Sequence, residues 1–178
     1  MIPRYSLPEM EAVFSDESRF GRWVEIELLA TEAHSALGIV PVADAATCRA
    51  NSPIIDARFI DEVLDREKIT DHDVAAFVDI LQSRIGGTAG AWVHYGLTSS
   101  DIVDTAWCWM LRDAADLLIE ASSKLLRVVV SLAKAHRDTV MIGRQHQSLE
   151  VRHDPSLFIT RNGSRLFRRI SVWSVGRD

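Results

Sequence analysis

Apolar residues recur every three or four positions along nearly the whole chain, which is the spacing of one face of an α-helix. No segment shows the sustained alternation of apolar and polar residues, rich in β-branched side chains, that a half-buried strand would show. Glycine and proline fall between the periodic segments and mark their ends. The pattern predicts an all-α protein.

The first 97 residues divide into several predicted helices. The longest begins after a cap at Ser15 or Asp16 and ends at Gly38. Its expected apolar face consists of Trp23, Ile26, Ala30, Ala33 and Leu37, widened by Leu29 and Ala36. Other helices are expected over residues 8–14, 43–50, 56–65 and 71–85, the last one ended by Gly86 and Gly87. We therefore predict a small N-terminal helical domain over residues 1–97, with a domain boundary near residues 86–98.

From Ser99 to about His136 neither proline nor glycine interrupts the apolar spacing. The main stripe is Ile102, Ala106, Met110, Ala114, Leu117, Ala121, Leu125, Val128, Leu132 and Ala135, with Val103, Trp107, Leu111, Ala115 and Leu118 beside it. Such a helix is on the order of 55 Å long, whereas a compact domain of this size is roughly 30 to 40 Å across. The apolar face of such a helix needs partner helices that this chain hardly supplies. We therefore predict that residues 98–147 begin a central helical bundle that other copies complete, which makes the protein a homo-oligomer. The alternative is a helix broken near residues 121–123 and folded back.

Charge is unevenly distributed along the chain. The net charge is -5, but residues 151–178 hold six arginines and two aspartates, which leaves -9 for the rest. An acidic body argues against nucleic acid as a partner, because phosphate neutralisation needs an excess of lysine and arginine. Residues 148–178 form an arginine-rich tail without a helical stripe, a candidate for disorder, and a nucleic-acid-binding role of this tail is a remaining alternative.

Cysteine spacing and hydropathy narrow the class of protein further. Cys48 and Cys108 have neither CxxC nor Cys/His spacing, so we expect no disulfide framework and no metal site. The N-terminus lacks the apolar core of a signal peptide, and no window reaches the roughly 18 apolar residues of a membrane span. We expect a reduced cytoplasmic protein with no membrane contact.

Polar side chains with chemical potential gather in four clusters. Arg4 and Tyr5 are either an exposed terminal arm or a phosphate-binding pair, because the arginine fork matches a phosphate. His72, between two aspartates, is either a helix cap or an imidazole oriented by Asp73 for proton transfer. His146 follows Gly143 and, taken alone, is most simply a structural or surface histidine.

The fourth cluster, HYGLTSSD, precedes the long predicted helix. Thr98, Ser99 and Ser100 are all candidate N-caps, and Asp101 suits the positive end of the helix dipole. One cap needs only one such residue. The remaining hydroxyls and the unpaired backbone N–H groups predict an anion site suited to a carboxylate.

In this order the clusters resemble the adenylosuccinate lyases of the fumarase/aspartase superfamily. The resemblance rests on IPRYSLPEM, WVEIELLATEAHSALGIVP, ITDHDVAAF and WVHYGLTSSDIVDTA, and runs from Ile2 to about His146. It implies a lyase of purine biosynthesis that eliminates fumarate from adenylosuccinate to give AMP, and from succinylaminoimidazole carboxamide ribotide. It also implies no metal or organic cofactor, and a homotetramer whose active sites are each built from three subunits.

The resemblance assigns binding roles to several positions. Arg4 and Tyr5 match the pair that binds the phosphate end of the nucleotide. Thr98 and Ser99 match the pair that holds a carboxylate of the succinyl group, and His94 is expected to support them without touching substrate. Ser100 and Asp101 then remain as the expected capping residues.

The resemblance also assigns the proton chemistry. His146 matches the general acid that protonates the leaving nitrogen, and His72 assists it. Asp71, His72 and Asp73 match positions that line the substrate site. Negative charge developing on a carboxylate during the elimination needs oriented hydroxyl and N–H donors.

The chain departs from the family after residue 144. Gln145 replaces the threonine of a GRTH motif, and nothing after Gln147 matches. The mobile loop with the catalytic serine base and its MP-K-NP-like stretch is absent, so we expect little or no lyase activity from this chain alone and hypothesise a frameshifted or truncated gene product. Two alternatives are a non-catalytic helical assembly module and a lyase acting on argininosuccinate or a carboxymuconate.

Overall fold

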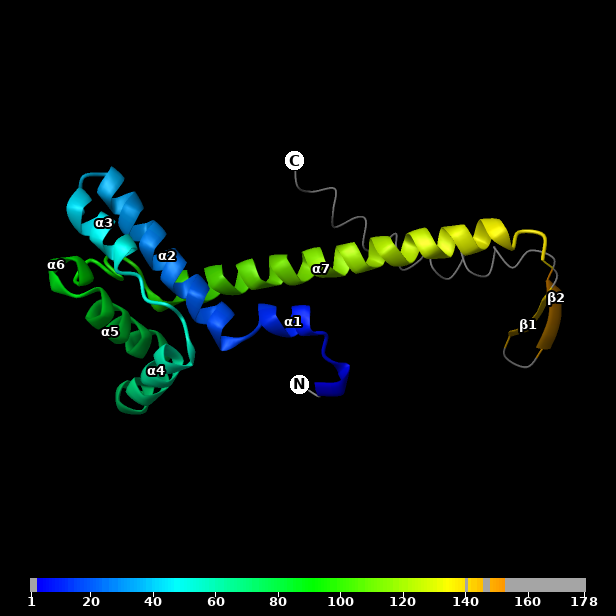
Figure 1. Cartoon of the computed structure of the whole chain (residues 1–178), viewed down its shortest axis with the longest axis horizontal. Helices are drawn as coiled ribbons and strands as arrows, with labels where there is room; N and C mark the ends of the chain where they lie inside the picture. Colours follow the sequence, from blue (N-terminus) through cyan, green and yellow to red (C-terminus); the bar gives the residue numbers. More distant parts are fainter. Residues whose placement is uncertain (1–2, 140, 146–147, 153–178) are drawn as a thin grey trace. The chain divides into compact units, whose positions relative to one another are not determined.

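The computed structural model describes residues 3–139, 141–145 and 148–152. Contacts divide the chain into two units, Met1–Ala114 and Ala115–Asp178. In the first unit a 3-10 turn, Pro3–Tyr5, precedes α1 (Pro8–Val13), α2 (Asp16–Ala36), α3 (Val42–Ala50), α4 (Ala57–Thr70), α5 (Asp73–Ile85) and α6 (Gly87–Gly90) (Figure 1). The long helix α7 (Ser99–Ala135) begins in this unit. The expected all-α class is confirmed for it.

Polar side chains cap the beginnings of α2 and α4, and Ser15 is one of the two caps that the sequence predicted for α2. Ser15 caps α2 by accepting the Ser18 N–H at 3.1 Å. Asp56 caps α4 by accepting the Phe59 N–H at 2.9 Å. That helix runs five residues beyond its predicted end at residue 65 and stops where Asp71 adopts a positive φ of 50°.

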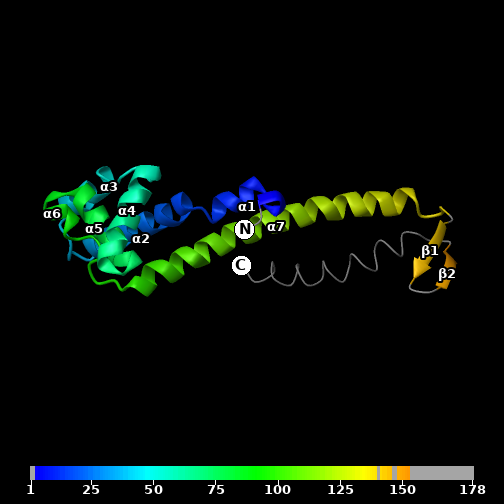
Figure 2. The same ribbon diagram turned by 90° about the horizontal axis from the view of Figure 1, so that it is seen from below.

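An aromatic cluster forms the centre of the first unit. Phe20 and Trp23 of α2 meet Phe59 of α4 and Phe77 of α5, and none of the four is more than 2% exposed. Phe20 and Phe77 are stacked with centroids 5.9 Å apart, and Trp23 meets the edge of Phe77 at 5.2 Å. Such ring pairs contribute about 0.5–1.5 kcal/mol each beyond their buried area. Two views show α2 to α6 gathered around this centre (Figure 1, Figure 2).

The buried face of α2 differs from the predicted one. Leu37 is 74% exposed and Ala33 is exposed, although both were expected on the apolar face. Glu27 and Thr31 are buried instead. The prediction is correct for Trp23, which is buried, and wrong for Ala33 and Leu37. Hydrophobic spacing treats glutamate and threonine as solvent-facing, whereas here the helix buries them with their hydrogen bonds satisfied.

The long helix is continuous over Ser99–Ala135, so the predicted helix is confirmed and a break near residues 121–123 does not occur. Within the first unit, Ile102 and Ala106 are fully buried against the core. The Arg22 guanidinium of α2 lies 2.6 Å from the Asp113 carboxylate of α7 and holds the pKa of that carboxyl below its usual range. The predicted boundary near residues 86–98 falls inside this unit.

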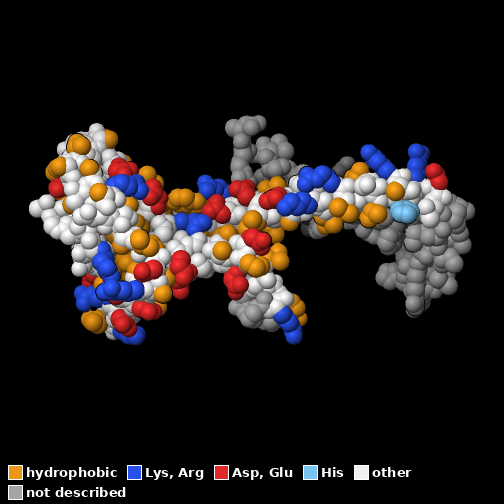
Figure 3. All heavy atoms as spheres, in the orientation of Figure 1, with side chains coloured by type: hydrophobic (Ala, Val, Ile, Leu, Met, Phe, Trp, Pro, Cys, Tyr) orange, Lys and Arg blue, Asp and Glu red, His pale blue; other side chains and the backbone are white. Residues whose placement is uncertain are grey.

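Beyond Ala114 the apolar stripe of α7 is solvent-exposed. Leu118 is 60% exposed, and Leu125, Val128 and Leu132 are also exposed. Figure 3 shows hydrophobic side chains along one side of this helix and basic ones along the other. In the described residues no helix is both long and apolar enough to cross a membrane.

A short antiparallel hairpin, β1 (Met141–Gln145) and β2 (Ser148–Arg152), belongs to the second unit. Met141 pairs with Arg152 and Gln145 with Ser148. It was not predicted, because strands of five residues are too short to show a clear period. This hairpin is the exception to the helical class among the described residues. Residues 153–178, most of the predicted arginine-rich tail, lie outside the described residues.

Two glycines in helices of the first unit have opposite surroundings. A Cβ on Gly90 would lie 2.5 Å from the main-chain carbonyl oxygen of Gln82, which cannot move away without disturbing α5. A Cβ on Gly21, inside α2, would meet nothing within 4 Å. Gly90 is therefore needed where α6 approaches α5, whereas Gly21 is not needed for packing.

We expect Gly90→Ala to lower the free energy of unfolding by about 1–3 kcal/mol through overpacking. The control, Gly21→Ala, should raise it by about 0.5–1 kcal/mol, because alanine loses less backbone entropy in a helix. Urea unfolding followed by circular dichroism measures both. Equal stability of the two variants would contradict the close approach of α5 and α6.

Candidate functional site

Two of the predicted polar clusters meet where α5 and α7 begin. His72 is the N-cap of α5 and Ser99 is the first residue of α7. Although they are 27 positions apart, the His72 Nε2 atom lies 3.4 Å from the Ser99 hydroxyl. About half of the His72 side chain is exposed, so a bound molecule can reach it.

The other ring nitrogen of His72 serves the helix cap. Nδ1 accepts the Ala75 N–H at 3.3 Å, and an accepting nitrogen bears no proton. The proton of the neutral ring is therefore on Nε2, which faces Ser99. Asp73 Oδ1 lies 3.4 Å from Nδ1 and accepts the Val74 N–H at 2.7 Å. If the ring is protonated, Nδ1 becomes a donor and the Asp73 carboxylate is available to it.

The cap of α7 leaves two hydroxyls unused. Asp101 accepts the Thr98 N–H at 2.8 Å, and its own N–H donates to the Thr98 carbonyl at 3.0 Å. The bond from the Thr98 N–H to the Asp101 carboxylate is one half of a capping box, with an aspartate in the usual position of glutamate. Asp101 therefore caps as expected, whereas Ser100 does not. Among the described residues the hydroxyls of Thr98 and Ser99 take no part in this cap and remain available at the positive end of the helix.

A buried carboxylate supports the loop that leads to Thr98. Glu27 of α2 is fully buried and its Oε2 accepts the His94 N–H at 2.8 Å. Its Oε1 lies 2.7 Å from Nδ1 of the same residue. His94 has a positive φ of 67°. Burial raises the pKa of Glu27, and the contacts with His94 oppose this rise. His94 thus precedes Thr98 and Ser99 in the sequence and contacts the buried Glu27 of the core.

Further contacts fix the same loop from three helices. The Trp92 indole N–H donates to Asp44 of α3 at 3.0 Å. The Gln82 amide of α5 donates to the Val93 carbonyl at 3.1 Å. Gly96 has a φ of 75°, and a Cβ there would lie 3.2 Å from the ring of His34 on α2. The loop is therefore held by contacts with α2, α3 and α5.

The remaining predicted residues lie apart from this junction or outside the described chain. Arg4 and Tyr5 are exposed, with the guanidinium 4.8 Å from the centre of the Tyr5 ring. Both views place their turn away from α5 and the start of α7 (Figure 1, Figure 2). Asp71 is exposed beside His72 at the end of α4. Gln145 belongs to β1, and His146 lies outside the described residues.

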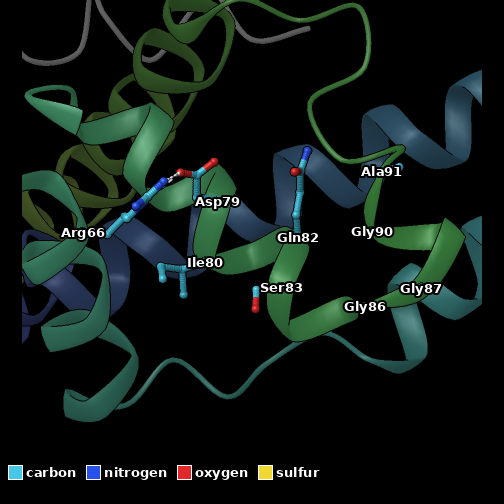
Figure 4. A pocket seen from close by; sticks show the side chains of 9 residues that line it. All are labelled: Arg66, Asp79, Ile80, Gln82, Ser83, Gly86, Gly87, Gly90 and Ala91. Carbon is cyan, nitrogen blue, oxygen red and sulfur yellow. Dashed lines mark hydrogen bonds and ion pairs between the residues drawn. The ribbon is translucent and has the colours of Figure 1, made fainter. Parts of the chain in front are cut away.

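A cavity of about 740 Å³ borders Asp73. It is lined by Phe14, Arg19, Trp23, Asp73, Val103, Asp104, Trp107 and Met110. A separate hollow of about 710 Å³ lies beside the Arg66–Asp79 ion pair and contains none of the expected substrate-binding residues (Figure 4).

The described residues contain no group of three or more His, Cys, Asp or Glu placed to hold a metal ion. The candidate site is thus the junction of His72, Asp73 and Ser99.

Glu27 is the residue that the sequence reasoning missed. Its only signal is its spacing, four residues after Trp23 and seven after Phe20, which places it on the buried face of α2. The other site residues were predicted from the sequence motifs that resemble those of the adenylosuccinate lyases. The meeting of His72 with Ser99 is a tertiary contact that spacing alone does not predict.

Comparisons with known proteins identify the family of this chain. Residues 4–148 match the family described as Lyase. Adenylosuccinate lyase of Bacillus subtilis is 43% identical over 146 residues, which cover 82% of this chain and 33% of that protein. The chain therefore spans about a third of the length of this relative.

Solved structures show the same fold. A fumarate lyase from Mesorhizobium sp. BNC1 is 28% identical, with a TM-score of 0.73 over 90% of this chain and 40% of that one. A 3-carboxy-cis,cis-muconate lactonizing enzyme from Pseudomonas putida has a TM-score of 0.84 at 24% identity, covering 97% of this chain and 40% of that one. The second likeness concerns the fold alone.

We expect Asp101→Ala to lower the free energy of unfolding by about 1 kcal/mol, because the Thr98 N–H loses its cap. Asp104→Ala, in the same region of α7 and likewise acidic, is the control and should change stability by less than half as much. Thermal unfolding of both variants measures the difference. Equal losses would show that the helix dipole, and not the capping bond, is responsible.

Proposed function

Because the chain belongs to the lyase family, we propose that it forms one part of the active site of an enzyme that eliminates fumarate from adenylosuccinate and releases AMP. The observation that carries this proposal is the meeting of His72 with Ser99 at the positive end of α7. Adenylosuccinate lyase from B. subtilis, at 43% identity, supports the choice of substrate. The same site would accept succinylaminoimidazole carboxamide ribotide, placing the enzyme in purine biosynthesis in the cytoplasm.

The proposed elimination makes a defined demand on these residues. A base removes a proton from the carbon next to a succinyl carboxylate, the electron pair forms the C=C bond of fumarate, and the C–N bond breaks. Negative charge grows on that carboxylate, where the hydroxyls of Thr98 and Ser99 and the N-terminus of α7 would stabilise it. The departing nitrogen takes a proton from the general acid.

Histidines would supply the proton transfer. We assign the general acid to His146, with His72 assisting through its Nε2 proton, which faces Ser99. Asp71 and Asp73 would border the substrate, and the phosphate would bind Arg4 and Tyr5 through the guanidinium fork.

The proposed enzyme is a homo-oligomer, a tetramer as in the adenylosuccinate lyases. Its support is the exposed apolar stripe of α7, where Leu118, Leu125 and Val128 lie in water although such a stripe normally faces other helices. In this arrangement the Thr98–Ser99 pair of one copy would meet His146 of another copy in one active site.

A chimaera tests the function. Residues 4–148 replace the matching segment of the B. subtilis enzyme, and release of AMP and fumarate from adenylosuccinate is measured. We expect turnover, and a loss of about 10²–10³ in kcat for Ser99→Ala, the size found when one donor to a developing anion is removed. Ser100→Ala, the adjacent hydroxyl, is the control and should stay within a few-fold of the parent.

Mixing inactive chimaeras tests the shared site. Subunits carrying Ser99→Ala and subunits carrying His146→Ala should regain activity when assembled together, because some sites then receive both intact residues. Full activity of Ser99→Ala would disprove the carboxylate role, and absence of recovery in properly assembled mixtures would disprove the sharing between copies.

A further inference from the structure

We propose that Glu27 is a positioning residue for the Thr98–Ser99 pair, acting through the main chain and ring of His94. The loop over residues 92–98 leads to both hydroxyls at the start of α7, and Glu27 contacts this loop from the interior of the helical unit. This inference rests on the proposed function for its catalytic consequence. Its structural part can be tested without any lyase activity.

Both oxygens of Glu27 are used by a single residue. Oε2 accepts the His94 N–H at 2.8 Å and Oε1 lies 2.7 Å from Nδ1, while the carboxylate itself is fully buried. Two contacts on one residue fix the backbone and the ring together. A hydrophobic residue would fill the space in the core but would do neither, so the glutamate has a purpose beyond packing.

The backbone of His94 requires such a partner. Its φ of 67° lies in the left-handed region, which costs a residue with a side chain about 1–3 kcal/mol unless the surroundings compensate. Four residues later the chain enters α7 at Thr98, where the capping box with Asp101 begins. A change in the backbone at His94 would therefore displace the first turn of α7, including Ser99 and its contact with His72.

Glu27 also decides which ring nitrogen of His94 carries a proton. An ionised carboxylate can only accept hydrogen bonds, so Nδ1 of His94, 2.7 Å from Oε1, carries the proton and donates it to Glu27. The side chain of His94 is 23% exposed. Glutamine at position 27 would keep the bond to the His94 N–H through its oxygen. Its NH2 group would then face Nδ1 and force the proton onto Nε2.

The same helix offers a matched control. Thr31 lies one turn further along α2, is 2% exposed and donates its hydroxyl to the Glu27 carbonyl at 2.9 Å. Thr31→Val removes a buried hydrogen bond from α2 at a similar depth without touching the loop. A purely structural role of Glu27 predicts that the two variants behave alike.

The test uses the full 178-residue chain labelled with ¹⁵N, with the ring nitrogens of His94 and the amides of Thr98 and Ser99 observed by NMR. We expect Glu27→Gln to move the His94 proton from Nδ1 to Nε2 and to shift the Thr98 and Ser99 amide signals, with helical content unchanged. Thr31→Val should lower the unfolding temperature and leave all these signals in place.

A second variant keeps the test decisive if Glu27→Gln does not fold. Glu27→Asp retains the charge but is one methylene too short to reach both groups, so exchange of the His94 amide hydrogen should become about tenfold faster. In the active chimaera, Glu27→Gln should lower kcat at least tenfold and Thr31→Val less than twofold. An unchanged tautomer and unchanged Thr98 and Ser99 signals in folded Glu27→Gln overturn the proposal, whatever the chimaera does.

Discussion

A carboxylate taken fully out of water must be hydrogen-bonded on both oxygens, and among the described residues Glu27 meets that constraint through His94. The same His94, whose N–H donates to Glu27, has a φ of 67° in the left-handed region. The tight approach of Gly96 to His34 then closes the loop. The first turn of α7 comes directly after this loop in the chain. The location of Ser99 beside His72 therefore depends on the carboxylate of Glu27, a buried side chain of α2.

Much of the helical architecture could be predicted from local signals. Ser15 and Asp56 cap where a short polar side chain precedes a periodic segment, and the unbroken spacing after Ser99 gives one long helix. The buried face of α2 could not be predicted, because Glu27 counts as polar in any periodicity and its burial depends on a residue 67 positions away. The β1–β2 hairpin was missed since five-residue strands carry little pattern.

The candidate site divides in the same way. Resemblance to a family named His72, Thr98 and Ser99 from motif wording, and local chemistry explained Asp101 as a cap. The contact between His72 and Ser99 and the hydrogen bond between the His94 N–H and Glu27 are tertiary contacts that no local rule contains. Removal of the weakly acidic carbon-bound proton next to a carboxylate requires hydrogen-bond donors already in place, and a loop fixed from α2, α3 and α5 would meet that requirement.

The central claim is that the start of α7 binds a carboxylate of the substrate. Titrating fumarate into the ¹⁵N-labelled chain and following the amide signals tests it most directly, since this needs neither turnover nor a partner. We expect saturable shifts of the amide signals of Thr98 and Ser99 and of the His72 ring signals. Ser99→Ala should weaken these shifts. Shifts confined to the hollow beside Arg66 and Asp79, or no saturable shift at Ser99, would contradict it.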